Sequence, residues 1–289
     1  MTAAVARRVT STKRDWARAL RHLLLAAPAV ILLGCIFGYP ILRLLTLGAT
    51  GGSFLPYRQV LGGDGPYLLV LWATLRISLA TVALCVLLGY PVAYFLATAS
   101  RLWRTIGFVF VLLPFWTSML VRTYAWIALL GRNGVINRTL IELGIIDQPL
   151  QLLYNFGGVL IGIVHVLLPY MVFPIYASLV RIDPNVVLAA EGLGAGGFAV
   201  FWRIYLPLTA SGVFAGAALV FTLSLGAFVT PALLGGGRII MIANLIQQEL
   251  SQFIDWPLAS ALAGILLAVV LPIYAGFSRS LRGARDVAV

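Results

Sequence analysis

Charged side chains are scarce in this sequence of 289 residues. Only 10% of the residues are charged, whereas 61% are hydrophobic and the mean hydropathy is +1.01. A soluble domain of this length could not cover its surface with so few charges, so a soluble globular fold is excluded. The composition therefore predicts an integral membrane protein.

Acidic residues are missing altogether from six long apolar stretches. These stretches cover residues 23–42, 77–100, 105–130, 157–180, 211–234 and 256–278. Each reaches the roughly 20 residues that a helix needs to cross the hydrocarbon. Open strands would leave backbone groups unpaired in lipid, so we expect helices. The predicted fold class is an all-α integral membrane protein with six transmembrane helices.

Residues suited to catalysis or metal binding are equally sparse. Cys35 and Cys85 lie apart in two apolar stretches, where we expect small apolar filler rather than a disulfide or a zinc site. His165 lies in the middle of the fourth stretch, where a hydrogen-bonded packing role and a pathway role both stay open. No Gly-x-x-x-x-Gly-Lys-[Ser/Thr] sequence is present, so any ATP would be bound by another chain. We therefore predict no enzyme activity, catalytic residue, metal site or cofactor in this chain.

Positive charge is abundant but placed at the ends of the apolar stretches. The net charge of +11 thus fits contact with membrane lipid rather than with nucleic acid. The distribution of Lys and Arg predicts both termini on the cytoplasmic side. The expected organisation is a basic cytoplasmic segment (1–21), a first transmembrane helix with an outer loop (22–70), a transmembrane domain (71–279) and a cytoplasmic tail (280–289).

Residues 183–207, which we call the coupling segment, lie between the fourth and fifth stretches on the expected cytoplasmic side. Asp183 and Pro184 are typical of a helix start, and residues 185–193 can form a short helix. Gly194 is suited to end that helix with a positive φ. Residues 198–206 can form a second short helix, which Pro207 would separate from the fifth stretch. This shape predicts a projection on which a partner acts; the alternative is an ordinary interhelical loop.

The spacing within the coupling segment resembles the cytoplasmic signature of ABC importer permeases. That signature is Glu-Ala-Ala, three residues, Gly, nine residues, Ile, one residue, Leu-Pro. The matching residues here are Ala189, Ala190, Gly194, Ile204, Leu206 and Pro207. The leading glutamate, which contacts the ATPase subunit in the family, is replaced by Leu188. Glu191, about one helical turn further on, is the candidate substitute for that acid.

Two further stretches resemble the permeases of spermidine/putrescine importers, most closely the first of that system's two permease subunits. They are residues 121–126 with 133–137, and residues 225–236. The resemblance implies a type I ABC importer permease in the bacterial inner membrane. It also implies a heterodimer with a second homologous permease, two ATPase subunits that bind ATP and Mg, and a periplasmic solute-binding protein. The solute implied by the resemblance is a small cation of the polyamine class.

Other functions stay open beside this one. Related permeases carry opines, GABA or other amino-acid-like solutes. A stand-alone secondary transporter is less favoured, because the membrane stretches hold so few ionisable groups and show no internal repeat. A membrane-bound enzyme would need a cluster of Asp, His or Cys at one membrane depth.

Candidate pathway residues follow from the same two stretches. Arg122 lies in the outer half of the third stretch, where it would either snorkel to the interface or face a wet cavity. Tyr124 and Trp126 are either interface residues or cation–π contacts for the solute. Phe228 and Thr230 complete the candidate pathway set.

An acidic pair at the outer mouth is the remaining candidate site. Glu249 and Asp255 flank the start of the sixth stretch. As exposed charges they would steer a cation or dock the binding protein through its basic residues.

Overall fold

The structure, a computed structural model, describes residues 27–49, 54–63 and 65–286. Within these residues it contains helices and no β-strand, which confirms the predicted all-α membrane fold. The elements are η1 (Gly34–Gly38), α2 (Tyr39–Leu47), α3 (Leu55–Leu61), α4 (Tyr67–Thr98), α5 (Arg101–Trp116), α6 (Met119–Leu130), α7 (Val135–Glu142), α8 (Phe156–Leu179), α9 (Pro184–Gly192), α10 (Gly197–Val200), η3 (Phe201–Tyr205), α11 (Leu206–Leu208), α12 (Ala210–Leu225), α13 (Val229–Leu234), α14 (Ile242–Gln248), η4 (Glu249–Phe253) and α15 (Trp256–Asp286).

Four helical segments are each long and apolar enough to cross a membrane without a break. They are Ala27–Leu47, Tyr67–Thr98, Phe156–Leu179 and Trp256–Gly276. Two more candidate spans are bent pairs: α5 with α6 and α7, bent by 102°, and the segment α10–α11 with α12, bent by 60°. Counting each bent pair as one span gives the six that the sequence predicts.

The third predicted span, residues 105–130, is divided between two helices. The backbone is extended at Thr117 and Ser118, where α5 ends and α6 begins. The side chain of Arg122 covers this break, because its guanidinium donates hydrogen bonds to the carbonyl oxygens of Pro114 and Thr117. The guanidinium thus binds carbonyl oxygens at the break, a contact that hydropathy cannot reveal.

The fifth predicted span, residues 211–234, is also interrupted. Helix α12 ends at Leu225, Gly226 caps it, and the separate short helix α13 starts at Val229. At its other end the prediction that Pro207 separates the coupling segment from the span is wrong. The helical backbone runs from η3 through Pro207 to Leu208, and the chain bends at Thr209 instead.

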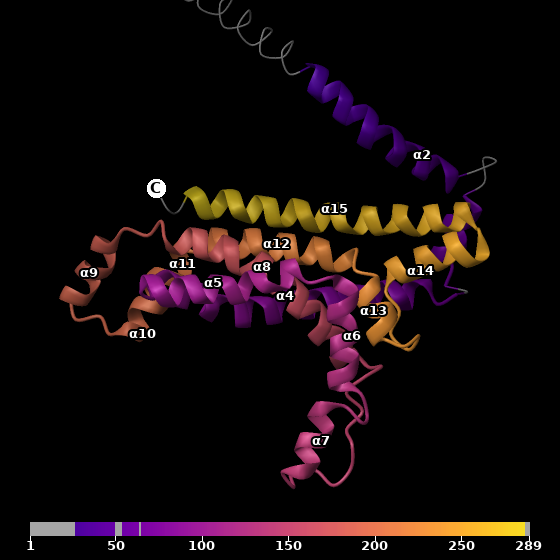
Figure 1. The fold of residues 1–289 in the computed structure, drawn as a ribbon. Helices are drawn as coiled ribbons and strands as arrows, with labels where there is room; N and C mark the ends of the chain where they lie inside the picture. The colour runs from indigo at the N-terminus through magenta and orange to yellow at the C-terminus, as the bar shows by residue number, and fades with distance from the viewer. Residues whose placement is uncertain (1–26, 50–53, 64, 287–289) are drawn as a thin grey trace, which may run out of the picture.

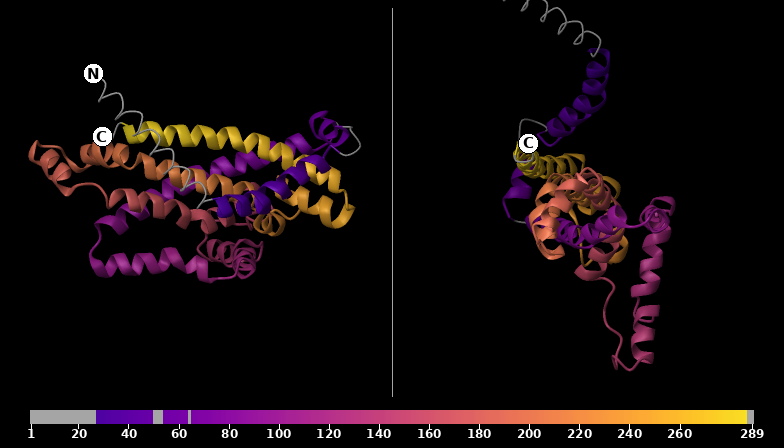
Figure 2. Two further views of the ribbon diagram at one scale, coloured as in Figure 1. Left: turned by 90° about the horizontal axis from the view of Figure 1, so that it is seen from above. Right: turned by 90° about the vertical axis from the view of Figure 1, so that its left-hand side faces the viewer.

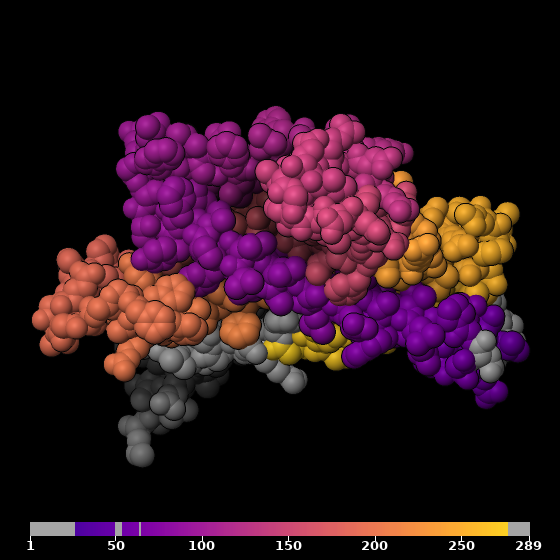
Figure 3. Space-filling view, turned by 90° about the horizontal axis from the view of Figure 1, so that it is seen from below, coloured from indigo at the N-terminus to yellow at the C-terminus, as the bar shows by residue number. Residues whose placement is uncertain are grey.

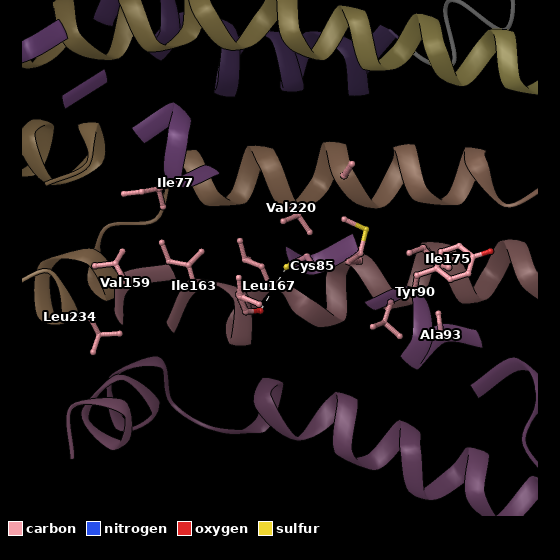
Figure 4. Packing of buried hydrophobic residues seen from close by; sticks show 14 of the residues in the cluster. Ile77, Cys85, Tyr90, Ala93, Val159, Ile163, Leu167, Ile175, Val220 and Leu234 are labelled. Carbon is pink, nitrogen blue, oxygen red and sulfur yellow. Dashed lines mark hydrogen bonds between the residues drawn. The ribbon is translucent and has the colours of Figure 1, made fainter. Parts of the chain in front are cut away.

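Helices α4, α8 and α12 pack together and form the centre of the bundle. Figure 4 shows part of their shared core, in which Ile77 and Cys85 of α4 lie near Val159 and Ile163 of α8 and Val220 of α12. Close approach of α12 to α8 depends on Gly212 and Gly216, four residues apart. A Cβ at Gly216 would lie 2.7 Å from Met171 Sδ, and one at Gly212 would lie 2.5 Å from the Pro174 carbonyl oxygen.

The two ends of the bundle carry different elements, as Figure 1 shows. Helices α9 and α10 project at one end, and α13 and α14 lie toward the other end. Helices α6 and α7 leave the bundle sideways, where residues 130–156 form a separate mass in Figure 3. The first span also departs from the bundle (Figure 2), and none of its most apolar window is buried within this chain.

Candidate functional site

The coupling segment has the local geometry that its sequence predicts. The Asp183 carboxylate accepts a hydrogen bond from the Asn185 amide at 2.9 Å and so caps α9. Gly194 has a φ of +87°, and a Cβ there would meet no atom within 4 Å. The turn therefore needs glycine for its backbone conformation and not for lack of space.

Large apolar side chains of the coupling segment are exposed at this end of the molecule. Leu188 is 62% exposed, Leu193 is 90% exposed and Phe198 is 81% exposed. Glu191 is exposed beside them and makes no ion pair with any residue that the structure describes. Large apolar side chains exposed together on one short segment are typical of a protein interface.

Some of the matched signature residues lie on this exposed surface, and others connect the coupling segment to the helix bundle. Ala189 and Pro207 are exposed, whereas Ala190, Ile204 and Leu206 are partly buried. Leu206 packs against the core cluster of the bundle. The first half of the signature is thus presented outward, and the second half leads back into the bundle.

An aromatic cluster that the sequence analysis missed joins the coupling segment to α4. Tyr90 packs edge-on against Phe201 at 5.4 Å between ring centroids, and Tyr94 packs edge-on against Tyr205 at 5.2 Å. Tyr90 and Tyr94 are four residues apart in α4, and Phe201 and Tyr205 are four residues apart in η3. This spacing is the sequence signal that could have revealed the cluster. Edge-on ring contacts of this kind stabilise the packing of the coupling segment against α4.

A buried hydrogen bond completes this joint at the bend before α12. The hydroxyls of Tyr90 and Thr209 lie 2.9 Å apart, and both side chains are buried. Thr209 already donates its hydroxyl proton to the Tyr205 carbonyl oxygen at 2.7 Å. Tyr90 is therefore the donor to Thr209, because a hydroxyl has one proton to give.

The third predicted span holds its polar side chains in local contacts. Arg122 also donates to the Thr117 hydroxyl at 3.0 Å, so its guanidinium is bound at the break between α5 and α6. Its side chain is partly exposed there, so the two roles expected from the sequence, snorkelling and facing a wet cavity, stay predictions. Trp126 donates from Nε1 to Nδ1 of His165 at 3.0 Å, which gives His165 the hydrogen-bonded packing role.

The other candidate pathway residues do not form one surface. Tyr124 and Phe228 are exposed, whereas Thr230 is 2% exposed. The methyl group of Thr230 packs so close to Gly162 of α8 that a Cβ there would lie 2.7 Å away. Helix α6 packs against α13 and α8. The helices that carry the candidate residues therefore contact each other, but Tyr124 and Phe228 are exposed whereas Thr230 is buried.

The acidic pair near the start of α15 departs from its expected exposure. Glu249 is 7% exposed, because η4 packs against α14 and α15. Burial, and next the nearby charge of Asp255, raise the pKa of Glu249 above its usual value. Asp255 is partly buried and accepts a hydrogen bond from the Leu258 amide at 2.9 Å, so it caps α15. Glu249 is thus wrongly predicted as an exposed charge.

Comparison with known proteins agrees with this geometry. Residues 85–281 match the family model described as "Binding-protein-dependent transport system inner membrane component". The chain is 36% identical to the spermidine/putrescine transport system permease protein PotB of Haemophilus influenzae over 72% of its own length and 74% of the relative. It is also 36% identical to PotB of Escherichia coli K12, over 72% of this chain and 75% of the relative.

A solved structure shares the fold. One chain of a bacterial alginate ABC transporter, crystallised with a periplasmic protein bound to an alginate pentasaccharide, superimposes with a TM-score of 0.71. The two chains are 20% identical, and the match covers 93% of this chain and 94% of that one. The apolar spans and the family match make this a multi-pass inner-membrane protein. The chain belongs to the family of binding-protein-dependent transport system inner membrane components, the permease subunits of ABC importers.

Proposed function

We propose that this chain is one permease subunit of an importer for polyamines such as spermidine and putrescine. The observation that carries the proposal is the 36% identity to PotB, which extends over 72% of the chain. The aromatic side chains of the candidate pathway suit a cation with alkyl stems. Acids are absent from the predicted spans, so recognition of the charged amines falls mainly to partner proteins.

The partners follow from surfaces that this chain leaves uncovered. The exposed apolar face of the coupling segment would pack into a groove on an ATPase subunit. The chain has no Gly-x-x-x-x-Gly-Lys-[Ser/Thr] sequence, so ATP and Mg are assigned to two ATPase partners. The first span, unburied within its own chain, would pack against a second homologous permease. A periplasmic solute-binding protein would deliver the solute.

The expected mechanism is alternating access with both termini in the cytoplasm. Closure of the ATPase subunits on ATP would displace the coupling segment. The aromatic cluster of Tyr90, Tyr94, Phe201 and Tyr205 would pass this displacement to α4. The bend at Thr209 would pass it to α12, so that the helix bundles of the two permeases rock against each other.

Reconstitution tests the proposal directly. The chain is purified with the second permease and ATPase encoded beside it, placed in proteoliposomes, and supplied with the neighbouring binding protein. We expect ATP-dependent uptake of labelled spermidine or putrescine, which an ATPase variant without its Walker lysine abolishes. Saturation by GABA or an opine, without competition by polyamines, would reject the polyamine assignment. Uptake that needs an ion gradient and no ATPase would reject the importer itself.

A further inference from the structure

A basic cavity lies at the end of the molecule away from the coupling segment. It has a volume of about 530 Å³, is partly open to the outside, and is lined by the end of α6, by residues 149–154 and by Arg238 in the turn between α13 and α14. These elements lie at the same end of the bundle in Figure 1. Arg132 and Arg238 both line it, and no acidic side chain of the described residues does.

The charge of this cavity is uncompensated. Arg132 and Arg238 are both exposed, and neither side chain makes a hydrogen bond or ion pair with the residues that the structure describes. A neighbouring cavity of about 400 Å³ shares Arg132 and adds Arg138, with Glu142 at its edge. Guanidinium groups left free in a recess present forked donors, which match the two oxygens of a carboxylate.

The wall that carries Arg132 is fixed by a buried asparagine. Asn137 is fully buried and donates from Nδ2 to the carbonyl oxygens of Gly131 at 3.1 Å and Leu150 at 2.9 Å. Its Oδ1 accepts the Leu150 amide proton at 2.8 Å. These bonds tie the turn before α7 to the segment that follows it, so Arg132 extends from a rigid base.

The wall that carries Arg238 is shaped by glycines. Gly236 and Gly237 have φ values of +55° and +75°. The ring of Tyr154 packs on Gly236 so closely that a Cβ there would lie 2.2 Å from Tyr154 Cδ1. The Tyr154 amide donates to the Leu234 carbonyl oxygen at 3.0 Å. These contacts fix the backbone of the segments that carry the two arginines, so binding a ligand need not order those segments.

The ligand of such a cavity must be anionic. Two free guanidinium groups would repel a polyamine, so the cavity cannot belong to the path of a cationic solute. A single inorganic anion would fill only a small part of 530 Å³, whereas a protein loop carrying Asp or Glu would fill it. We propose that this arginine cavity docks acidic side chains on the solute-binding protein. The proposal rests on the importer function and moves docking away from Glu249 and Asp255.

The test measures binding and transport separately. Arg132→Gln/Arg238→Gln is made in the complete importer in nanodiscs, and its affinity for the cognate binding protein is measured at low and high salt. We expect about a tenfold weaker affinity at low salt, the loss typical of two exposed charge pairs, and a flatter salt dependence. In transport, the half-saturating concentration of binding protein should rise while the maximal rate is kept. Arg58→Gln removes an exposed arginine outside the cavity and should leave both readouts unchanged.

Rescue separates docking from a structural role. Arg132→Glu/Arg238→Glu should lose transport and regain it with binding-protein variants selected from an Asp/Glu→Lys library. Unchanged affinity in the Gln variant, or a lower maximal rate at unchanged affinity, would overturn the proposal. So would loss of inorganic phosphate or phosphatidylglycerol binding at unchanged protein affinity. The affinity measurement does not depend on which solute is transported. Failure of polyamine uptake would therefore reject the proposed solute without deciding whether the arginine cavity docks the binding protein.

Discussion

Tyr90→Phe should uncouple ATP hydrolysis from transport while leaving the aromatic cluster in place. The substitution keeps the ring that packs on Phe201 and removes the hydroxyl that donates to Thr209 at 2.9 Å. Thr209 is fully buried but keeps its own bond to the Tyr205 carbonyl oxygen, so no donor is left orphaned. The loss is therefore that of one net hydrogen bond, about 1 kcal/mol.

That magnitude sets the size of the functional effect. If the bond exists in one transport conformation and not in the other, its removal shifts the equilibrium between them by up to about fivefold. The assay is the ratio of solute imported to ATP hydrolysed in proteoliposomes, together with the stimulation of ATPase activity by binding protein. We expect the ratio to fall and the basal ATPase rate to stay or rise. Thr209→Ser, which keeps a hydroxyl, is the matched control.

A double-mutant cycle decides whether the bond itself is responsible. Thr209→Val removes the acceptor, so Tyr90→Phe in that background should add little further loss. Fully additive losses, or normal coupling in Tyr90→Phe, would show that the hydroxyl pair is a packing detail and refute the reasoning.

Three further predictions concern single residues. Gly194→Val should destabilise the turn by about 1 kcal/mol or more, since a β-branched residue must adopt a φ near +87°; reduced co-purification of the ATPase is the measurement, and an intact complex would contradict it. Glu191→Ala should loosen the ATPase contact, and Leu188→Glu in that background should restore coupling; normal transport by Glu191→Ala would exclude a role for this acid. Glu249→Gln should raise the apparent unfolding temperature at pH 8. Burial and Asp255 raise the Glu249 pKa, so the ionised carboxylate destabilises the folded state above that pKa, whereas below about pH 4 the group is neutral and this cost is absent. A change in unfolding temperature that is the same at every pH would contradict the prediction.

Sequence alone predicts the elements whose cause is local. Hydropathy places α4, α8 and α15, and the Asp183 cap with Gly194 places the turn of the coupling segment. The break at Thr117, where the Arg122 guanidinium binds a carbonyl oxygen, and the break after Leu225 were not predicted. These breaks are not visible to a window of average hydropathy.

In the candidate site, too, local features could be predicted from the sequence, whereas features that depend on contacts between separate elements could not. Exposure of Leu188 follows from its place in a short helix between two spans. Burial of Glu249 depends on the packing of η4 against α14 and α15, which are separate elements. The arginine cavity was missed because Arg132 and Arg238 are more than a hundred residues apart, and the sequence does not show that the segments held by Asn137 and Tyr154 line one cavity.

Replacement of the signature glutamate by Leu188 gives the ATPase contact an unusual response to temperature and salt. Leu188, Leu193 and Phe198 form a large apolar part of its exposed surface, and association driven by apolar burial weakens on cooling and strengthens in sulfate. Charge pairs at the arginine cavity respond in the opposite way to salt, because ions screen them. Cold should therefore release the ATPase from one end of the permease, whereas high salt should release the binding protein from the other.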